Sequence, residues 1–159
     1  MKKILNIKVY IFGIIIFLID LISKIIVSKT LNYHESIKVI KNFFYLTYTK
    51  NTWAAFSILE DGRILFLIVT VIVLFFINQY MNKHKLIKLE LVSYSLLLGG
   101  IVGNLFDRII YGYVIDFLDF RIFGYNYPIF NLADSFIVVG VIMLIIDNLI
   151  KEKKCKKLK

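Results

Sequence analysis

Gly99–Asp134 reads GGIVGNLFDRIIYGYVIDFLDFRIFGYNYPIFNLAD, and this stretch decides the fold. It begins inside a long apolar run, in which Gly100, Gly103, Asn104 and Asp107 recur at helical spacing and therefore share one face of a helix. A membrane helix turns such a polar stripe toward the protein interior, away from lipid. We therefore expect the chemistry of this protein to lie along this stripe.

The rest of the stretch leaves the helical pattern and then returns to it. Asp116 lies in a segment whose composition is strand-like and loop-like. Asn131 is typical of a helix N-cap, and Asp134 three residues later completes the pattern of a capping box. Gly99 and Gly103 form a G-x-x-x-G pair, which allows another helix to approach closely.

The whole chain has the composition of a membrane protein. Its 159 residues are 59% hydrophobic and 16% aromatic and include one proline, an apolar share above that of soluble domains. Four apolar runs are long enough to cross a bilayer as helices. We predict a single mainly α membrane domain, residues 1–159, with four transmembrane helices at about 9–27, 64–80, 89–110 and 132–150.

The two long connectors, 28–63 and 111–131, are predicted to form a small extracytoplasmic β-sheet. The segment NFFYLTYT at 42–49 is rich in aromatic and β-branched residues, which is typical of a strand. The segment 36–40 is its predicted partner.

The distribution of lysines predicts the orientation in the membrane. The formal net charge is +9, and the lysines lie beside apolar runs, which favours an anionic inner leaflet over nucleic acid as the partner. The N-terminal segment and the 82–88 loop carry three lysines each, and the 151–159 tail, expected to be solvated, carries six. The positive-inside rule then places both termini in the cytoplasm. Asp107, Asp116 and Asp134 gather at the outer membrane surface.

Several kinds of site are disfavoured. Cys155 is the sole cysteine, so the chain has no internal disulfide and no multi-cysteine metal site. His34 and His84 are predicted on opposite sides of the membrane, which disfavours a nucleophile activated by histidine. We expect no metal and no cofactor.

A pair of carboxylates is the remaining strong option, because two close carboxylates share a proton. One can then act as a base on water while the other polarises a peptide carbonyl. The candidates are Asp107, Asp116, Asp119 and Asp134. Asp107, beside Arg108 within a helix, is better suited to an ion pair. Asp119 is interpreted as a rim charge that shares a strand face with Arg121, opposite Asp116. From the residues alone Asp116 and Asp134 also fit a loop acid and a helix-capping acid, and the choice stays open.

The first span carries two charges of its own. Asp20 and Lys24 are four residues apart and share a helix face, so they can pair inside the bilayer. The pair is interpreted as an ion pair that makes two buried charges tolerable, or as a structural support for a polar site.

At these residues the sequence resembles the lipoprotein signal peptidase (signal peptidase II) family of bacterial membrane aspartyl peptidases. The resemblance covers nearly the whole chain, on a four-span frame, with the motifs in the family's order. The matching segments are Asp20–Lys24 (DLISK), Gly103–Arg108 (GNLFDR), Val114–Phe117 (VIDF) and Phe130–Asp134 (FNLAD).

The resemblance implies roles for individual residues and a substrate. It implies a catalytic dyad of Asp116 and Asp134, surrounded by substrate contacts from Asn51, Asn104, Arg108 and Asn131. The implied substrate is a prolipoprotein that carries diacylglycerol on a cysteine and is cut just before that cysteine. The implied location is the bacterial cytoplasmic membrane, with the active site at the outer face. We expect a monomer whose partners are these substrates and membrane lipids.

The sequence departs from the family at one position. The family pattern N-x-G-A-A-F becomes Asn51-Thr52-Trp53-Ala54-Ala55-Phe56 here, so tryptophan replaces a glycine.

Two other functions are alternatives to a peptidase. A small transporter would use Asp20, Lys24 and Asp107 to line an ion path, and an inactive membrane-binding relative would keep the fold without the chemistry. A transporter should spread polar residues through the membrane depth, whereas here they concentrate at the outer end.

Overall fold

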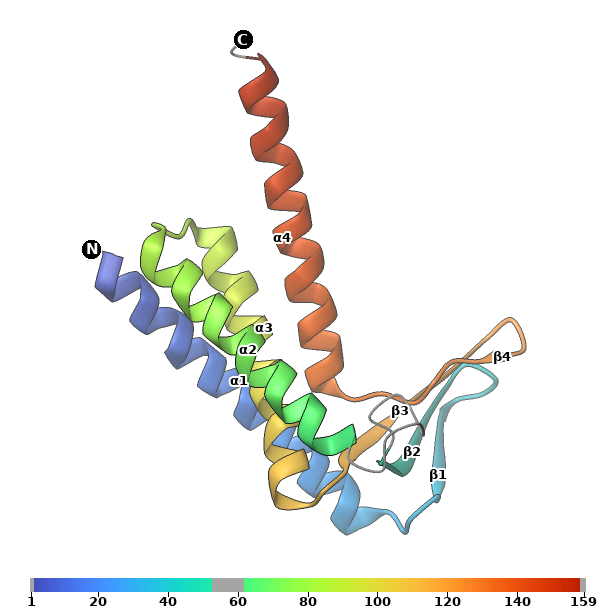
Figure 1. Cartoon of the computed structure of the whole chain (residues 1–159). Helices are drawn as coiled ribbons and strands as arrows, with labels where there is room; N and C mark the ends of the chain where they lie inside the picture. Colours follow the sequence, from blue (N-terminus) through green and yellow to red (C-terminus); the bar gives the residue numbers. More distant parts are fainter. Residues whose placement is uncertain (1, 53–61, 158–159) are drawn as a thin grey trace.

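The computed structural model describes residues 2–52 and 62–157, and its main elements are four long helices (Figure 1). In chain order they are α1 (Lys2–Thr30), α2 (Gly62–Lys83), α3 (Lys88–Ile110) and α4 (Leu132–Lys157). All four are long and apolar enough to cross a membrane, as the sequence predicted. Most of their outward side chains are exposed and apolar, which suits contact with lipid.

The helices run beyond the apolar segments from which they were predicted. The tail predicted to be solvated from residue 151 is exposed through residue 156, and it is helical, because α4 continues to Lys157. Lysine and glutamate are good helix formers, and Lys151 is fixed by ion pairs to Glu90 (2.8 Å) and Asp147 (2.6 Å).

Helix α3 is the central helix, because it packs against both α1 and α4. A Cβ atom at Gly99 would lie 2.5 Å from Cγ2 of Ile16 in α1, and one at Gly100 would lie 2.5 Å from the carbonyl oxygen of Ala133 in α4. Side chains at these two positions would push the helices apart. The close approach predicted for Gly99 and Gly103 is present, since a Cβ atom at Gly103 would lie 2.5 Å from Oδ2 of Asp20 in α1, and Gly100 adds a second close contact, with α4.

A four-stranded antiparallel sheet lies at the end of the helices opposite both chain termini (Figure 1). Its strands, in spatial order, are β1 (Ser36–Ile40), β2 (Phe44–Asn51), β3 (Val114–Ile122) and β4 (Tyr125–Asn126). β1 has the predicted bounds, whereas β2 begins two residues later than predicted. The cause is Asn42, whose φ of 58° belongs to the turn between the two strands.

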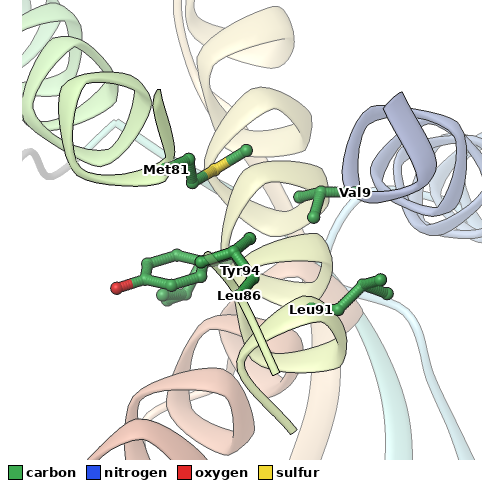
Figure 2. Packing of buried hydrophobic residues seen from close by; sticks show 6 residues of the cluster. Val9, Met81, Leu86, Leu91 and Tyr94 are labelled. Carbon is green, nitrogen blue, oxygen red and sulfur yellow. The ribbon is translucent and has the colours of Figure 1, made fainter. Parts of the chain in front are cut away.

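Two buried apolar clusters hold the ends of the molecule together. One joins α1, α2 and α3 at the end that carries the termini and contains Val9, Met81, Leu86, Leu91, Tyr94 and Leu97 (Figure 2). The other joins the sheet to α1 through Val27, Leu31, Tyr48, Ile115 and Phe117. The second cluster fixes β3 against the ends of the helices opposite the termini, and β3 carries Asp116.

Candidate active site

The start of α4 fixes Asp134. Asn131 is the N-cap residue, and its Oδ1 accepts a hydrogen bond from the Asp134 backbone N–H (3.0 Å). In return Oδ2 of Asp134 accepts one from the Asn131 backbone N–H (3.2 Å). This is the predicted capping box. It holds a half-buried carboxylate at the positive end of the helix dipole.

Asp116 lies on β3 and is 2% exposed. Its Oδ1 accepts a hydrogen bond from Nδ2 of Asn131 (2.6 Å), and its Oδ2 accepts one from Nδ2 of Asn51 (2.7 Å). Asn51 ends β2, which pairs with β3. The sheet and the start of α4 therefore both hold this carboxyl group.

Asn104 of α3 connects the two aspartates. Its Nδ2 donates to Oδ1 of Asp134 (2.7 Å), and its Oδ1 accepts from Nδ2 of Asn131 (3.1 Å). Since Asn131 also donates to Asp116, two asparagine side chains link the two carboxyl groups. Residues distant in the sequence thus form one network where the end of α3 meets the start of α4.

A buried charge cluster lies beneath this network. Lys24 Nζ lies 2.7 Å from Oδ2 of Asp20 and 3.0 Å from Oδ2 of Asp107, and all three side chains are 1% exposed. Lys24 also donates to Oδ1 of Asn104 (3.1 Å). The predicted Asp20–Lys24 pair is present, and Asp107 has the ion-pair role predicted for it. Lys24 pairs with both carboxylates and all three side chains are enclosed, an arrangement that gives no support to an ion path along them.

The same cluster binds the backbone of the elements that carry the two aspartates. Oδ1 of Asp20 accepts a hydrogen bond from the Ala133 N–H (2.9 Å), and Oδ2 of Asp107 accepts one from the Ile115 N–H (3.1 Å). Ala133 precedes Asp134, and Ile115 precedes Asp116. Each buried carboxylate therefore positions the residue next to one of the two aspartates.

A family model described as Signal peptidase (SPase) II matches residues 12–150. The chain belongs to the signal peptidase II family. It is an aspartyl peptidase by that membership.

Individual relatives agree with this assignment. The chain is 45% identical over 138 residues to the lipoprotein signal peptidase of Halothermothrix orenii, a match that covers 87% of this chain and 92% of the relative. Two solved structures titled as a bacterial membrane enzyme are each 36% identical. One, at 1.9 Å resolution, has a TM-score of 0.83 and covers 89% of this chain and 92% of its own; the other, at 2.3 Å, has a TM-score of 0.84 and covers 95% and 92%.

In this signal peptidase II, burial has a direct effect on Asp116. The pKa of the Asp116 carboxyl group is raised to about 6. Desolvation by burial is the largest cause and the nearby negative charge of Asp134 adds to it, while the hydrogen bonds from Asn51 and Asn131 oppose the shift. Oδ1 of Asn51 is buried and has no hydrogen-bond partner within residues 2–52 and 62–157. A 180° flip of the Asn51 amide would let this oxygen accept the proton of a neutral Asp116.

Arg108 lies beside the network without joining an ion pair. Its Nη1 donates to the backbone oxygen of Asn104 (3.2 Å), and its guanidinium lies 5.5 Å from the ring centre of Phe66. No carboxylate of the described residues lies within ion-pair distance of it. Within residues 2–52 and 62–157 its charge is therefore not taken up by an ion pair.

The prediction that Asp119 is a rim charge was wrong, because its side chain is buried. It is 6% exposed, accepts a hydrogen bond from Oγ1 of Thr47 (2.8 Å) and pairs with Arg121 (3.4 Å). The predicted partnership with Arg121 is present. Thr47 lies on the same face of the sheet as Tyr45, which pairs with Asp119. The burial of Asp119 therefore depends on how β2 pairs with β3, which the sequence of β3 alone does not show.

An apolar cavity of about 500 Å³ adjoins Asp134. Its lining includes Phe120, Tyr127 and Phe130 from the sheet side and Val138 from α4. The carboxyl group of Asp134 therefore meets space that suits an apolar segment of a substrate. Trp53, which replaces the family glycine, lies outside the described residues.

Proposed function

We propose that Asp116 and Asp134 form the catalytic dyad with which this signal peptidase II removes signal peptides from prolipoproteins. The single observation that carries the proposal is the network in which Asn104 and Asn131 link the two carboxyl groups. A pair of acids held in this way suits metal-free peptide hydrolysis, in which one acid is charged and the other neutral.

The environments of the two acids suggest their roles. Asp134 accepts N–H donors at a helix N-terminus, which favours the carboxylate. Asp116 is buried, and its raised pKa favours the neutral acid. In the proposed reaction Asp134 takes a proton from water, the water oxygen bonds to the scissile carbon, and Asp116 donates a hydrogen bond to the carbonyl oxygen. The C–N bond then breaks as the amine nitrogen takes a proton from the dyad.

The proposal extends to the substrate and the sidedness. We infer that the precursor carries diacylglycerol on its cysteine and is cut just before it, with the lipid kept in the bilayer. The supporting features are the apolar cavity beside Asp134 and the charge of Arg108, which forms no ion pair with the described residues. The lysine distribution supports cytoplasmic termini and a dyad at the outer face of the cytoplasmic membrane. A monomer suffices, since one chain supplies both acids and the asparagines between them.

Cleavage of a lipid-modified precursor by purified variants tests the dyad. Asp116→Asn and Asp134→Asn should each lower the cleavage rate by at least about 10²–10⁴-fold. The double variant should lose little more than either single variant, because the two acids act as one unit.

Asp119→Asn is the matched control, because it changes a buried aspartate of the same strand without touching the network. It should keep most of the activity. Near-normal turnover by either dyad variant, or a folded but inactive Asp119→Asn, would reject the assignment. A precursor without the lipid should be cut more slowly if the lipid is recognised.

A further inference from the structure

A second binding surface lies at the other end of the molecule, far from Asp134 along α4. Two adjoining cavities of about 550 and 450 Å³ lie over α3, between α2 and α4, and share Tyr80, Tyr94 and Leu144 among their lining residues. We call this continuous surface the α2–α4 groove. The signal peptidase reaction described above uses none of its residues.

The groove is apolar along its length and aromatic at its end. Phe76 and Ile77 of α2, Leu97 of α3 and Leu144 of α4 supply apolar lining. Tyr94 extends from α3 into the space between α2 and α4 (Figure 2). Its ring lies 5.7 Å from that of Tyr80. Tyrosines in this arrangement are typical of the boundary between hydrocarbon and head groups.

The α2 side of the groove is cationic. Lys83 and His84 line it, and both side chains are exposed. The His84 ring stacks on Tyr80 with 4.2 Å between ring centres, and its Nδ1 lies 3.0 Å from the Tyr80 backbone oxygen. The imidazole is thereby held at the edge of the groove, next to the Lys83 ammonium on the same helix end.

The α4 side has an excess of negative charge. Glu90 and Asp147 are 5% and 6% exposed, and both pair with Lys151. Lys151 is the one cation among the described residues within ion-pair distance of them. Oε2 of Glu90 also accepts a hydrogen bond from the Ile87 N–H at the start of α3 (2.9 Å). The two buried carboxylates share one ammonium group among the described residues, so this edge keeps one excess negative charge.

We propose that the α2–α4 groove binds a phospholipid whose head group carries both a phosphate and a primary ammonium. The phosphate lies at Lys83 and His84, the ammonium at the Glu90–Asp147 pair, and the acyl chains along Leu97 and Leu144. A primary ammonium donates hydrogen bonds to carboxylate oxygens, whereas a quaternary ammonium has no N–H to donate. An anionic head group without a cation would meet the unpaired negative charge.

Lipid titration of the purified full chain in detergent tests this proposal. Native mass spectrometry would measure one-to-one adducts with phosphatidylethanolamine, phosphatidylcholine and phosphatidylglycerol of identical acyl chains. We expect phosphatidylethanolamine to bind about fivefold more tightly than either of the others, the effect of one partly exposed ion pair. Equal binding of the three lipids, or tighter binding of phosphatidylglycerol, would overturn the proposal.

Single substitutions test which side of the groove binds the ammonium and which side binds the phosphate. Asp147→Asn keeps the shape and one Lys151 partner, and it should abolish the preference for phosphatidylethanolamine. Glu152→Gln is its control, since that carboxylate lies on the same helix but pairs with Lys156 outside the groove. Lys83→Gln should weaken the binding of all three lipids, whereas Lys153→Gln should leave their binding unchanged. If Asp147→Asn does not fold, an unchanged affinity of Lys83→Gln for every lipid rejects the site by itself.

Discussion

At the scale of single residues, Asp116 combines a buried carboxyl group with donors from two different elements. Burial raises its pKa to about 6, although Asn51 and Asn131 both donate hydrogen bonds that favour the charged form. The desolvation cost therefore exceeds the contribution of two short hydrogen bonds. In the proposed mechanism this keeps a proton on the dyad close to neutral pH.

The raised pKa of Asp116 predicts how activity and stability depend on pH. We expect kcat/KM to fall on the alkaline side of about pH 6, approaching tenfold per unit, because the neutral acid is lost there. A flat kcat/KM from pH 6 to 8 would contradict the role of Asp116 as the proton carrier.

The stability of the folded protein should also decrease as pH rises. The folded state binds the Asp116 proton more tightly than the unfolded chain, so the free energy of unfolding should fall as pH rises from about 4 to about 6, by at most about 3 kcal/mol. Thermal unfolding in detergent would measure this slope, and Asp116→Asn should reduce it.

At the scale of elements, the Asp20–Lys24–Asp107 cluster joins α1 and α3 to the backbone at the start of β3 and α4. Gly103 leaves room for Oδ2 of Asp20, because a Cβ atom at position 103 would lie 2.5 Å from that oxygen. The glycine stripe of α3 thus makes room for a buried charge as well as for a neighbouring helix.

The cluster predicts an order of stability among variants. Lys24→Met leaves two buried carboxylates unpaired and should lose the most folded protein, since breaking a buried pair costs roughly 3–5 kcal/mol. Adding Asp20→Asn should recover part of the loss, and adding Asp107→Asn as well should recover more, because asparagine still accepts the Ala133 and Ile115 N–H groups. Yield and thermal unfolding of the purified variants would measure the order. Additive losses would show that the three residues are not coupled.

At the scale of the whole molecule, the sheet and both aspartates lie at one end, and both termini lie at the other (Figure 1). This arrangement places the proposed chemistry on one side of the membrane and the lysine-rich segments on the other. The proposed orientation, with the termini in the cytoplasm, rests on the distribution of the lysines.

The orientation predicts which thiols an impermeant reagent can reach. Cys155 is exposed near the end of α4, and we expect a membrane-impermeant maleimide to label it only after the membrane is opened. Tyr125→Cys in a Cys155→Ser background is the matched control, because Tyr125 is 66% exposed on β4 at the opposite end. It should be labelled in intact spheroplasts. The reverse pattern would invert the topology and place the dyad on the cytoplasmic side.

The sequence by itself determined the features that depend on near neighbours along the chain. The four apolar runs predicted four helices, the residues 36–40 predicted β1, and Asn131 with Asp134 predicted the capping box. The four-residue spacing of Asp20 and Lys24 predicted their ion pair. These contacts follow from the helical period or from fixed offsets, so the pattern of residue types is enough to find them.

Only the tertiary structure decided which distant groups meet. Asp20 reaches the backbone of Ala133, Asp107 reaches Ile115, and Asn131 reaches Asp116. The burial of Asp119 and the pairing of Lys151 across α3 and α4 likewise differ from what local pattern predicts. Such contacts depend on how closely the glycines of α3 let the helices pack and on the register in which distant strands pair. Neither the packing distance nor the register is encoded in the spacing of residue types along one element.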